Sequence, residues 1–386
     1  MPVPDSRVQS ADAVIIGGGP AGAVAGRELA RLGMRIIIIE RGQRNRETTC
    51  GHCLNPRILP QLDAIDLRQP IEDIAVGETR ALGLHLSGRA AVRFRLARGL
   101  MVRRTDLDQL LLDEAARHGA IVMQPATARI EFIHGHTAVV AATHKATTTR
   151  WRTRLLVGAD GLRSCVARHA GWSPSRTGRG YGFSFQIKDP GQHELRPETI
   201  EMFLDRTGYL GIVREAGGTL HIGALVLPRA EQKLAPDAFV RAVANRFEML
   251  QQIGLDQIRT TDMRSLTAAG PMPHAPDRIA GGSCALIGDA AGYIEPFTGE
   301  GMTWAMESAL LLAGAVQQHG QWSAATARTY EAHWQREVGR AQRRCRAIAR
   351  LVRAPGLVRT VCGFSLGRQF IAQQLAGRVA GKAVAA

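Results

Sequence analysis

The stretch DAVIIGGGPAGAVAGRELARLGMRIIIIER, residues 12–41, constrains the fold more than any other part of the chain. It opens with a short apolar strand at 13–16 and closes with four consecutive isoleucines at 36–39, a run typical of a strand buried on both faces. Between them, over 20–32, small and apolar residues recur at the spacing of a helix. This order predicts a strand–helix–strand unit and, with it, an α/β fold that contains a parallel sheet.

Three glycines stand at the first turn of this unit in the pattern Gly17-x-Gly19-x-x-Gly22. In such a turn the first glycine permits the tight bend, the second lets a pyrophosphate approach the backbone, and the third lets helix and strand pack closely. The helix then directs its unpaired N–H groups at the phosphates. Glu40 ends the second strand, eighteen residues after Gly22, where a carboxylate can accept hydrogen bonds from ribose hydroxyls. The pattern therefore predicts a dinucleotide site.

Two later stretches indicate which dinucleotide is bound. LLVGADGLRSCVAR, residues 155–168, is an apolar strand that enters Gly-Ala-Asp-Gly before a helix. CALIGDAAGYIEPFTGEGMTWAMESALLLAGAV, residues 284–316, runs from a strand through a Gly-Asp pair and a loop into a long helix. With the first motif, these stretches make residues 10–350 similar to FAD-dependent oxidoreductases of the aromatic-hydroxylase fold, and most of all to their geranylgeranyl-reductase-like branch. The resemblance implies FAD as the cofactor.

The resemblance also implies roles for residues at matching positions. Asp289 would hold the ribityl chain, and the backbone N–H groups of Gly301 and Met302 would face the flavin ring, where a helix N-terminus stabilises the reduced, anionic ring. Arg104, in VRRTDLDQLLLDEA, would contact FAD. Asp160 would lie near FAD or, alternatively, act only as the N-terminal acid of a helix. The cofactor-binding residues expected from the motifs and the resemblance are Gly17, Gly19, Pro20, Ala21, Gly22, Glu40, Arg41, Arg104, Asp160, Gly288, Asp289, Pro296, Gly299, Gly301 and Met302.

Residues 180–275 have a different, β-rich character. Short runs such as YGFSFQIKD, TIEMFLD, YLGIVRE and LHIGALV alternate with turn signals and predict an antiparallel sheet, the substrate platform of this fold. Phe185, Phe203 and Tyr209 are candidate substrate contacts, with plain core packing as the alternative. The expected organisation is α/β: a Rossmann-type FAD-binding domain over 10–175 and 276–330, an inserted antiparallel β-sheet substrate-binding domain over 176–275, and a basic C-terminal helical segment over 331–386.

The segment TTCGHCLNPR, residues 48–57, holds two cysteines at the spacing of a dithiol pair. Thiol–disulfide enzymes of the thioredoxin type carry this pair at the start of a helix, whereas here it follows the second strand of the nucleotide-binding unit. In the resembling family this place holds a Cys-Gly and an apolar-x-Pro turn beside the flavin. The resemblance thus implies that Cys50 is the candidate catalytic residue in the active-site wall and that Cys53 packs. No second cysteine pair or His-Cys cluster completes a metal site in the sequence.

The net charge of +15 is concentrated at the C-terminus. From Arg336 onward there are eleven Lys or Arg and one acid, a balance of +10 that leaves +5 for the first 335 residues. Over 336–353, arginines occupy one half of a helical wheel and apolar residues the other half. A helix docked on its own domain explains this pattern, and the alternative is contact with an anionic membrane surface or an acidic carrier. No aromatic-interleaved basic patch accompanies the charge, so nucleic-acid binding is not expected.

Two classes of function follow from these features. In the first, NADPH or NADH binds transiently, because only one dinucleotide fold is visible, and the enzyme hydroxylates a lipophilic or phenolic small molecule. The alternative within this class is reduction of a double bond in an isoprenoid or polyketide-type lipid. YLGIVRE lacks the tryptophan and proline of the aromatic-x-Trp-x-Phe-Pro signature of geranylgeranyl reductases, which favours hydroxylation. In the second class the protein is non-enzymatic or uses Cys50 and Cys53 as a dithiol.

The N-terminal residues have neither the basic nor the apolar region of a secretory signal. The sequence also has no uncharged apolar stretch of about 18 residues, the length that a membrane-spanning helix requires. We therefore expect a cytoplasmic protein, with peripheral membrane contact through the basic helix as the alternative.

Overall fold

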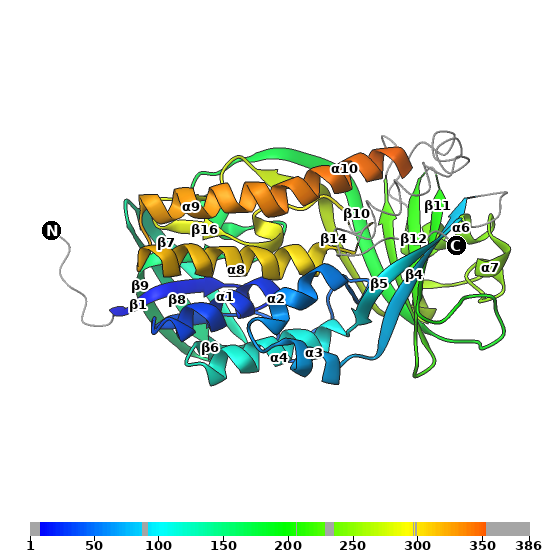
Figure 1. The fold of residues 1–386 in the computed structure, drawn as a ribbon, viewed down its shortest axis with the longest axis horizontal. Coiled ribbons are helices and arrows are strands. Elements are labelled where there is room, and N and C mark those ends of the chain that lie inside the picture. Colours follow the sequence, from blue (N-terminus) through cyan, green and yellow to red (C-terminus); the bar gives the residue numbers. More distant parts are fainter. Residues whose placement is uncertain are drawn as a thin grey trace.

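The predicted strand–helix–strand unit forms the centre of the first of two sheets (Figure 1). Strands β1 (Val8–Ile16) and β2 (Ile36–Ile39) pair in parallel, and helix α1 (Pro20–Arg31) connects them. The isoleucines of β2 are 0–1% exposed, as expected for a strand covered on both faces. The computed structural model describes residues 8–86, 92–205, 207–227, 235–295, 297 and 299–352.

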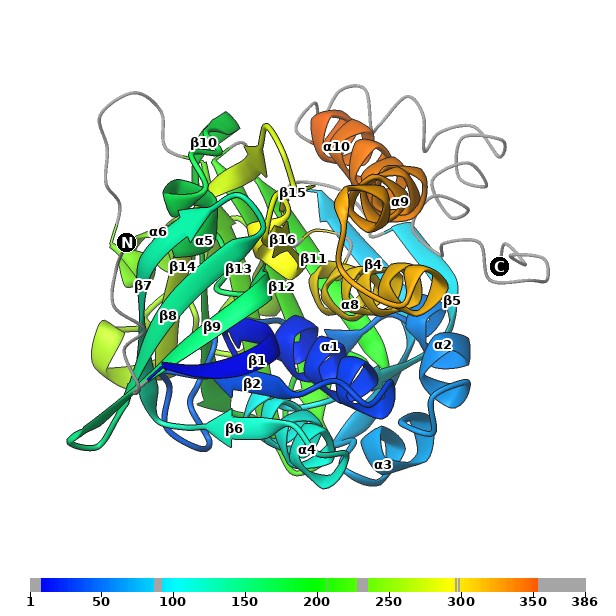
Figure 2. The ribbon, with the colours of Figure 1, turned by 90° about the vertical axis from the view of Figure 1, so that its left-hand side faces the viewer.

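Sheet A, which contains this unit, has eight strands (Figure 2). Its main path runs β15-β16-β9-β1-β2-β6, and β8 connects β9 to β7. Helices α4 (Arg104–Arg117) and α8 (Gly301–His319) pack on either side of α1 over one face of the sheet. The remaining strands of sheet A are β6 (Ile121–Met123), β7 (Ala126–His134), β8 (Thr137–His144), β9 (Thr147–Gly158), β15 (Ala280–Gly281) and β16 (Cys284–Leu286).

Sheet B contains the strands predicted over 180–226 and follows the path β14-β10-β13-β12-β11-β4-β5-β3. Its neighbouring strands are antiparallel, except that β4 and β11 run parallel. Three of its strands come from residues 53–101, which the sequence analysis placed in the FAD-binding domain, so the sheet is wider than the predicted insertion. Its strands are β3 (Cys53–Leu54), β4 (Gly77–Leu86), β5 (Val92–Met101), β10 (Pro174–Lys188), β11 (Thr199–Asp205), β12 (Gly208–Glu215), β13 (Thr219–Val226) and β14 (Arg264–Pro276).

The two faces of sheet B have different partners. One face packs in a core with α6 (Pro236–Ala244) and α7 (Glu248–Gln251), and the other faces the nucleotide-binding half of the molecule. Side chains of a strand alternate between these faces, so each strand contributes to both environments. The short helices that complete the described fold are α2 (Leu59–Asp63), α3 (Arg68–Asp73) and α5 (Cys165–His169), with 3-10 turns at Pro56–Ile58, Thr260–Asp262 and Gly288–Ala290.

The described part of the basic segment begins within α9 (Ala324–Trp334), which starts before it, and continues through a π-helical turn at Gln335–Gly339 into α10 (Arg340–Val352). The expected division of faces is observed over 336–350. Its apolar residues Val338, Ala341, Cys345 and Ile348 are buried, and its arginines Arg336, Arg340, Arg343, Arg344 and Arg350 are exposed. Residues 353–386 of the predicted segment lie outside the described residues. Within the described ranges, none of the helices combines the length and the apolar character needed to cross a bilayer.

Candidate active site

A cavity of about 1430 Å³ lies between the two sheets. Sites for one small molecule usually measure about 300–1,000 Å³, so this space can hold a cofactor and a second molecule together. The first turns of α1 and α8 form one part of the cavity wall, and strands of sheet B form another part. The glycine motifs and the β-rich region thus meet at one cavity.

The first turn of α1 leaves open space beside its second glycine. Gly17, Gly19 and Pro20 line the cavity, with Gly19 at the N-cap and Pro20 at the first helical position. A Cβ atom added at Gly19 would have no neighbour closer than the Arg104 guanidinium, 3.8 Å away. Gly22 lies behind this turn, because a Cβ there would stand 1.9 Å from the Gly17 carbonyl oxygen. The turn therefore fits a pyrophosphate over Gly19 and a packing role for Gly22.

Glu40 is held rigidly at the end of β2. Its carboxylate accepts the Gly18 N–H at 2.6 Å and the Gly42 N–H at 2.5 Å, one on each oxygen. A carboxylate has about four acceptor positions, so both oxygens keep the capacity to bind ribose hydroxyls. Arg41 follows in the same wall. These contacts fix the orientation of the predicted ribose acceptor.

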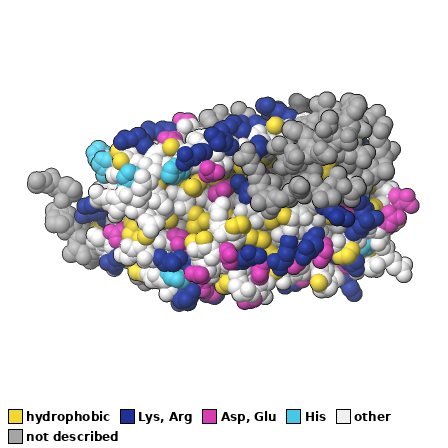
Figure 3. Space-filling model, viewed as in Figure 1, with side chains coloured by type: hydrophobic (Ala, Val, Ile, Leu, Met, Phe, Trp, Pro, Cys, Tyr) yellow, Lys and Arg dark blue, Asp and Glu magenta, His cyan; other side chains and the backbone are white. Residues whose placement is uncertain are grey.

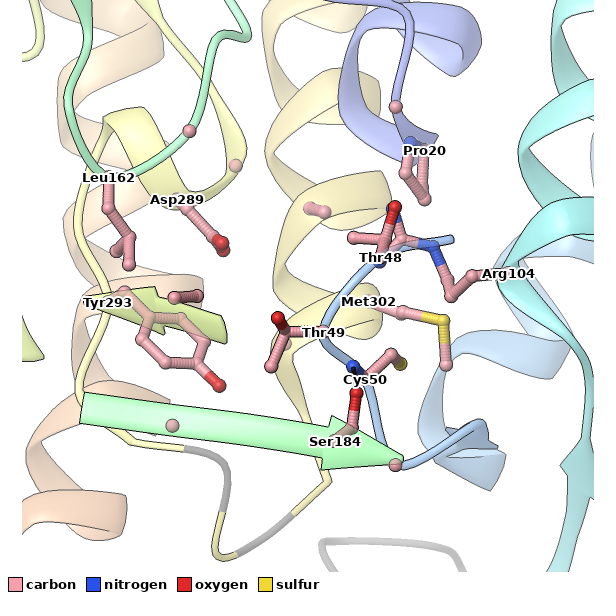
Figure 4. Close-up of a pocket in the computed structure, with 18 of the residues that line it drawn as sticks. Pro20, Thr48, Thr49, Cys50, Arg104, Leu162, Ser184, Asp289, Tyr293 and Met302 are labelled. Carbon is pink, nitrogen blue, oxygen red and sulfur yellow. Dashed lines mark hydrogen bonds between the residues drawn. The ribbon is translucent and has the colours of Figure 1, made fainter. Parts of the chain in front are cut away.

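Asp289 points into the cavity beside the start of α8 (Figure 4). It belongs to the turn Gly288–Ala290, which is fixed by a 2.8 Å hydrogen bond from the Gly288 N–H to the Ser308 hydroxyl. Burial raises the pKa of the Asp289 carboxyl to about 6, and the nearby positive charge of Arg104 opposes this rise. Gly299, Gly301 and Met302 line the same wall, as expected for residues beside a flavin ring. Pro296 lies outside the described residues.

The raised pKa of Asp289 predicts a pH-dependent effect on the apoprotein. A buried acid with a raised pKa keeps its proton longer in the folded state, so it lowers stability as pH rises from about 4 to 6. Asp289→Asn removes this penalty, and we expect the apoprotein to gain about 3 kcal/mol at pH 8 and little at pH 4. Thermal denaturation at both pH values measures the difference. An equal gain at both would contradict the assignment.

Arg104 is the first residue of α4 and lies in the cavity wall, where its side chain is 12% exposed. Its guanidinium donates to both carboxylate oxygens of Asp108, at 2.7 and 2.8 Å. Burial lowers the pKa of Arg104, but Asp108 and the Cys50 thiol outweigh it and leave the pKa above its usual value. A permanent cation is thus fixed near Gly19, a place suited to a phosphate.

Asp160 has structural features suited to both of the roles that the sequence left open. One oxygen accepts the Cys165 N–H at 2.6 Å and so caps α5. The other oxygen is buried and has no hydrogen-bond partner among the described residues, and the residue lines the cavity. The open acceptor fits contact with a ligand as well as the capping role.

Cys50 lies in the cavity wall next to strand β10 (Figure 4). Its N–H donates to the Ser184 hydroxyl at 3.1 Å, and its sulfur accepts the His52 N–H at 3.3 Å. Cys53 starts strand β3 and is not bonded to Cys50. Burial, and then the charge of Cys50, raise the pKa of the Cys53 thiol to about 12, so this thiol is a poor nucleophile at neutral pH. This arrangement favours the flavin-wall interpretation over a reactive dithiol.

The structure separates the three residues predicted to contact substrate. Tyr209 lines the cavity, with its ring 5.3 Å from that of Phe297. Phe185 and Phe203 are 2% and 0% exposed in the core under α6 and α7, which corrects the prediction for them. Strand alternation places them on the face opposite to Ser184 and Met202, their sequence neighbours. The cavity residues that the sequence analysis did not identify include Thr48, Thr49, Ser184, Met202, Gly211, Gly223, Thr267 and Tyr293.

Together these features fit FAD: open space over Gly19, a fixed ribose acceptor at Glu40, a buried cation at Arg104 and an unpartnered acceptor on Asp160. Within the described residues, no group of three or more His, Cys, Asp or Glu side chains is placed to hold a metal ion.

Comparisons with known proteins agree with this geometry. The sequence profile described as FAD binding domain matches residues 10–343. The chain is 28% identical over 326 residues to a menaquinone reductase of Mycolicibacterium smegmatis, which covers 80% of this chain and 77% of the relative. It is 24% identical over 340 residues to digeranylgeranylglycerophospholipid reductase 2 of Methanothermobacter thermautotrophicus, covering 85% and 84%. The solved structure of a flavin-dependent brominase has the same fold, with a TM-score of 0.80, 19% identity and coverage of 96% and 94%.

Proposed function

Because this chain belongs to the FAD-binding-domain family and is an FAD-dependent oxidoreductase, we propose that it reduces a double bond in a lipophilic, isoprenoid-bearing substrate. The observation that carries the proposal is that one cavity joins the cofactor-type wall to a largely apolar wall of sheet B. Bound FAD would supply the hydride chemistry. In this proposal the protein binds the two partners side by side in one space.

The relatives favour reduction over the hydroxylation that the sequence analysis ranked first. Both curated relatives are named reductases, and the molecules in their names carry isoprenoid chains. The likeness to a brominase, at 19% identity, concerns the fold alone. Hydroxylation of a lipophilic or phenolic compound is the second candidate, and the absence of the tryptophan signature in YLGIVRE is the observation in its favour.

The apolar wall suits a bulky substrate. Met202, Tyr209 and Val213 line it, and the glycines Gly211 and Gly223 lie directly opposite each other on β12 and β13. Gly211 holds the position at which the geranylgeranyl-reductase signature has tryptophan, counted from Tyr209. We therefore expect more room over this part of the sheet than a tryptophan would leave.

A nicotinamide cofactor, NADPH or NADH, is the proposed reductant. Arg163, Arg168 and Arg179 are exposed and line the same cavity. Arginine is well suited to phosphate groups, so these residues are candidates for the transient contact with the reductant.

Product mass tests the proposed reaction. Holoenzyme supplied with NADPH would be incubated in air with geranylgeranyl diphosphate and, separately, with menaquinone. The proposal expects a product heavier by two hydrogens, with fragmentation placing both of them in the isoprenoid chain and not on the quinone ring. A product heavier by one oxygen atom would replace it with the hydroxylase.

We further propose that α10 brings the enzyme to an anionic membrane surface, where such substrates dissolve. Lys and Arg side chains follow the upper edge of the molecule in Figure 3, along α9 and α10 of Figure 1. Each arginine near an anionic surface contributes about 1 kcal/mol of attraction. Reversal of Arg340, Arg343, Arg344 and Arg350 to Glu should abolish sedimentation with phosphatidylglycerol vesicles. Reversal of the exposed Arg152 and Arg154 on β9 serves as the control, and equal loss in both variants would contradict a specific surface.

A further inference from the structure

At the end of β12, the buried carboxylate of Glu215 contacts two side chains, His221 and Arg103, which lie far from each other in the sequence. Glu215 is 5% exposed. Its carboxylate accepts a 2.7 Å hydrogen bond from His221 on β13 and is also bonded by the Arg103 guanidinium. Neither the cofactor wall nor the apolar wall described above includes Glu215 or His221. The cluster therefore has no role in the proposed function so far.

His221 connects Glu215 to the turn that contains Cys50 and His52. The imidazole rings of His221 and His52 are in contact, with centroids 4.4 Å apart. His52 has φ +59°, a left-handed conformation that costs a residue with a side chain about 1–2 kcal/mol. This backbone turns the ring away from the cavity into a buried site, while the His52 N–H remains on the Cys50 sulfur. Contact with His221 thus offsets the strain and fixes the turn.

This turn lies on the cavity face of sheet B. Gly51 stands over Gly223, because a Cβ at Gly223 would come within 3.8 Å of the Gly51 Cα. The Cys50 N–H is bonded to Ser184, whose hydroxyl is 3.1 Å from that of Thr267 on β14. The position of Cys50 in the cavity wall therefore depends on contacts with three strands of the sheet.

Arg103 connects Glu215 to Arg104, the buried arginine of the cofactor wall. Arg103 is the N-cap of α4 and directly precedes Arg104. Val102 precedes Arg103, and its N–H donates to the His52 carbonyl at 2.8 Å. This backbone bond links the His221–His52 contact to the Arg103 contact. Arg103 itself is 43% exposed, so its contact with Glu215 spans from the surface to the interior.

We propose that Glu215 is a positioning residue that sets Cys50 and Arg104 against the cofactor through His221–His52 and Arg103. The inference rests on the proposed flavin site and deepens it, since it identifies how the substrate sheet and the cofactor wall are held in register. A ligand that displaces β12 or β13 would therefore move Cys50 and Arg104 together.

The charge states of Glu215, His221 and His52 agree with a fixed arrangement of these side chains. Burial lowers the pKa of His52 to about 3, and burial also lowers the pKa of His221 despite its bond to Glu215. Burial opposes ionisation of Glu215, but hydrogen bonds from His221 and Arg103 outweigh it and lower its pKa. A neutral imidazole therefore donates to a carboxylate throughout the neutral range.

The chain offers a matched control on the opposite face of the same sheet. His85 and Glu201 form a second buried pair at 2.7 Å, with the His85 ring stacked on Phe203. Neither residue lines the cavity. Glu201→Gln therefore alters a buried Glu–His pair like that of Glu215 and His221, but without the arginine contact and without a path to the cofactor wall.

The test compares Glu215→Gln with Glu201→Gln in the full chain by two measurements. In the apoprotein, mass spectrometry follows alkylation of Cys50 by iodoacetamide, and the ratio of the rate in each variant to the rate in the unaltered protein is compared. We expect Glu215→Gln to accelerate Cys50 alkylation about tenfold or more, and Glu201→Gln to leave this ratio unchanged. In the holoenzyme, only Glu215→Gln should shift the flavin absorbance spectrum.

An unchanged Cys50 ratio in Glu215→Gln, or an equal change in Glu201→Gln, would overturn the proposal. If Glu215→Gln does not fold, His52→Gly replaces it, because glycine adopts the left-handed backbone freely and removes only the ring. The same acceleration is then expected, and an unchanged ratio overturns the proposal. The alkylation measurement needs no FAD, so failure of the proposed function would appear separately, as an apoprotein that does not take up flavin.

Discussion

Gly22→Ala is expected to destabilise the protein by about 3 kcal/mol or more, the upper end of the range for substitutions that force extra atoms into a packed interior. The new Cβ would stand 1.9 Å from the Gly17 oxygen and 3.1 Å from the Ala159 side chain. The Gly17 backbone cannot retreat easily, because a Cβ at Gly17 would already be within 2.2 Å of the Ala159 oxygen. The nucleotide-binding turn and β9 would have to separate. Urea denaturation of the apoprotein measures the loss.

Gly314→Ala is the control for this prediction. Gly314 is also helical, within α8, but a Cβ there would meet nothing within 4 Å. Alanine should then stabilise the helix by about 0.5–1 kcal/mol. Similar effects of the two substitutions would contradict the packing role of Gly22.

Gly19→Ala is expected to leave the apoprotein folded and to weaken FAD binding on the order of 100-fold. Gly19 has φ −68° and ψ −177°, angles that alanine adopts without strain. Its added methyl group would meet no protein atom within 3.8 Å and would project into the space assigned to the pyrophosphate. The effect thus separates cofactor binding from folding, which Gly22→Ala does not.

Calorimetric titration of the apoprotein with FAD measures this loss, and a thermal melt checks that the fold is intact. Unchanged affinity in a folded Gly19→Ala protein would place the pyrophosphate elsewhere. A lowered melting temperature would show instead that the turn has no free space.

Local patterns in the sequence predicted the nucleotide-binding unit well. The isoleucines of β2, the glycines of α1 and the helix that begins at Gly301 each carry their signal within about ten residues, because period and turn chemistry are local properties. The burial of Cys345 and Ile348 in α10 followed from helical spacing in the same way.

The parts that the sequence did not predict depend on contacts between distant residues. The widening of sheet B requires β4 to pair in parallel with β11, more than one hundred residues away, and no local pattern encodes such a pairing. Alternation predicts that Phe185 and Ser184 face opposite ways, but not which of the two faces the cavity. Glu215 was missed for the same reason, since its partner Arg103 lies 112 residues away in sequence.

An anaerobic single turnover tests the central claim most directly. The holoenzyme would be reduced with dithionite under argon and mixed with geranylgeranyl diphosphate or menaquinone, while absorbance near 450 nm, about the position of the oxidised flavin band, is followed. The account predicts that the absorbance returns without oxygen and that one substrate molecule gains two hydrogens in its isoprenoid chain, not on the quinone ring, for each enzyme. Absorbance that returns only when oxygen is admitted, with substrate either unchanged or carrying an added oxygen atom, would contradict it.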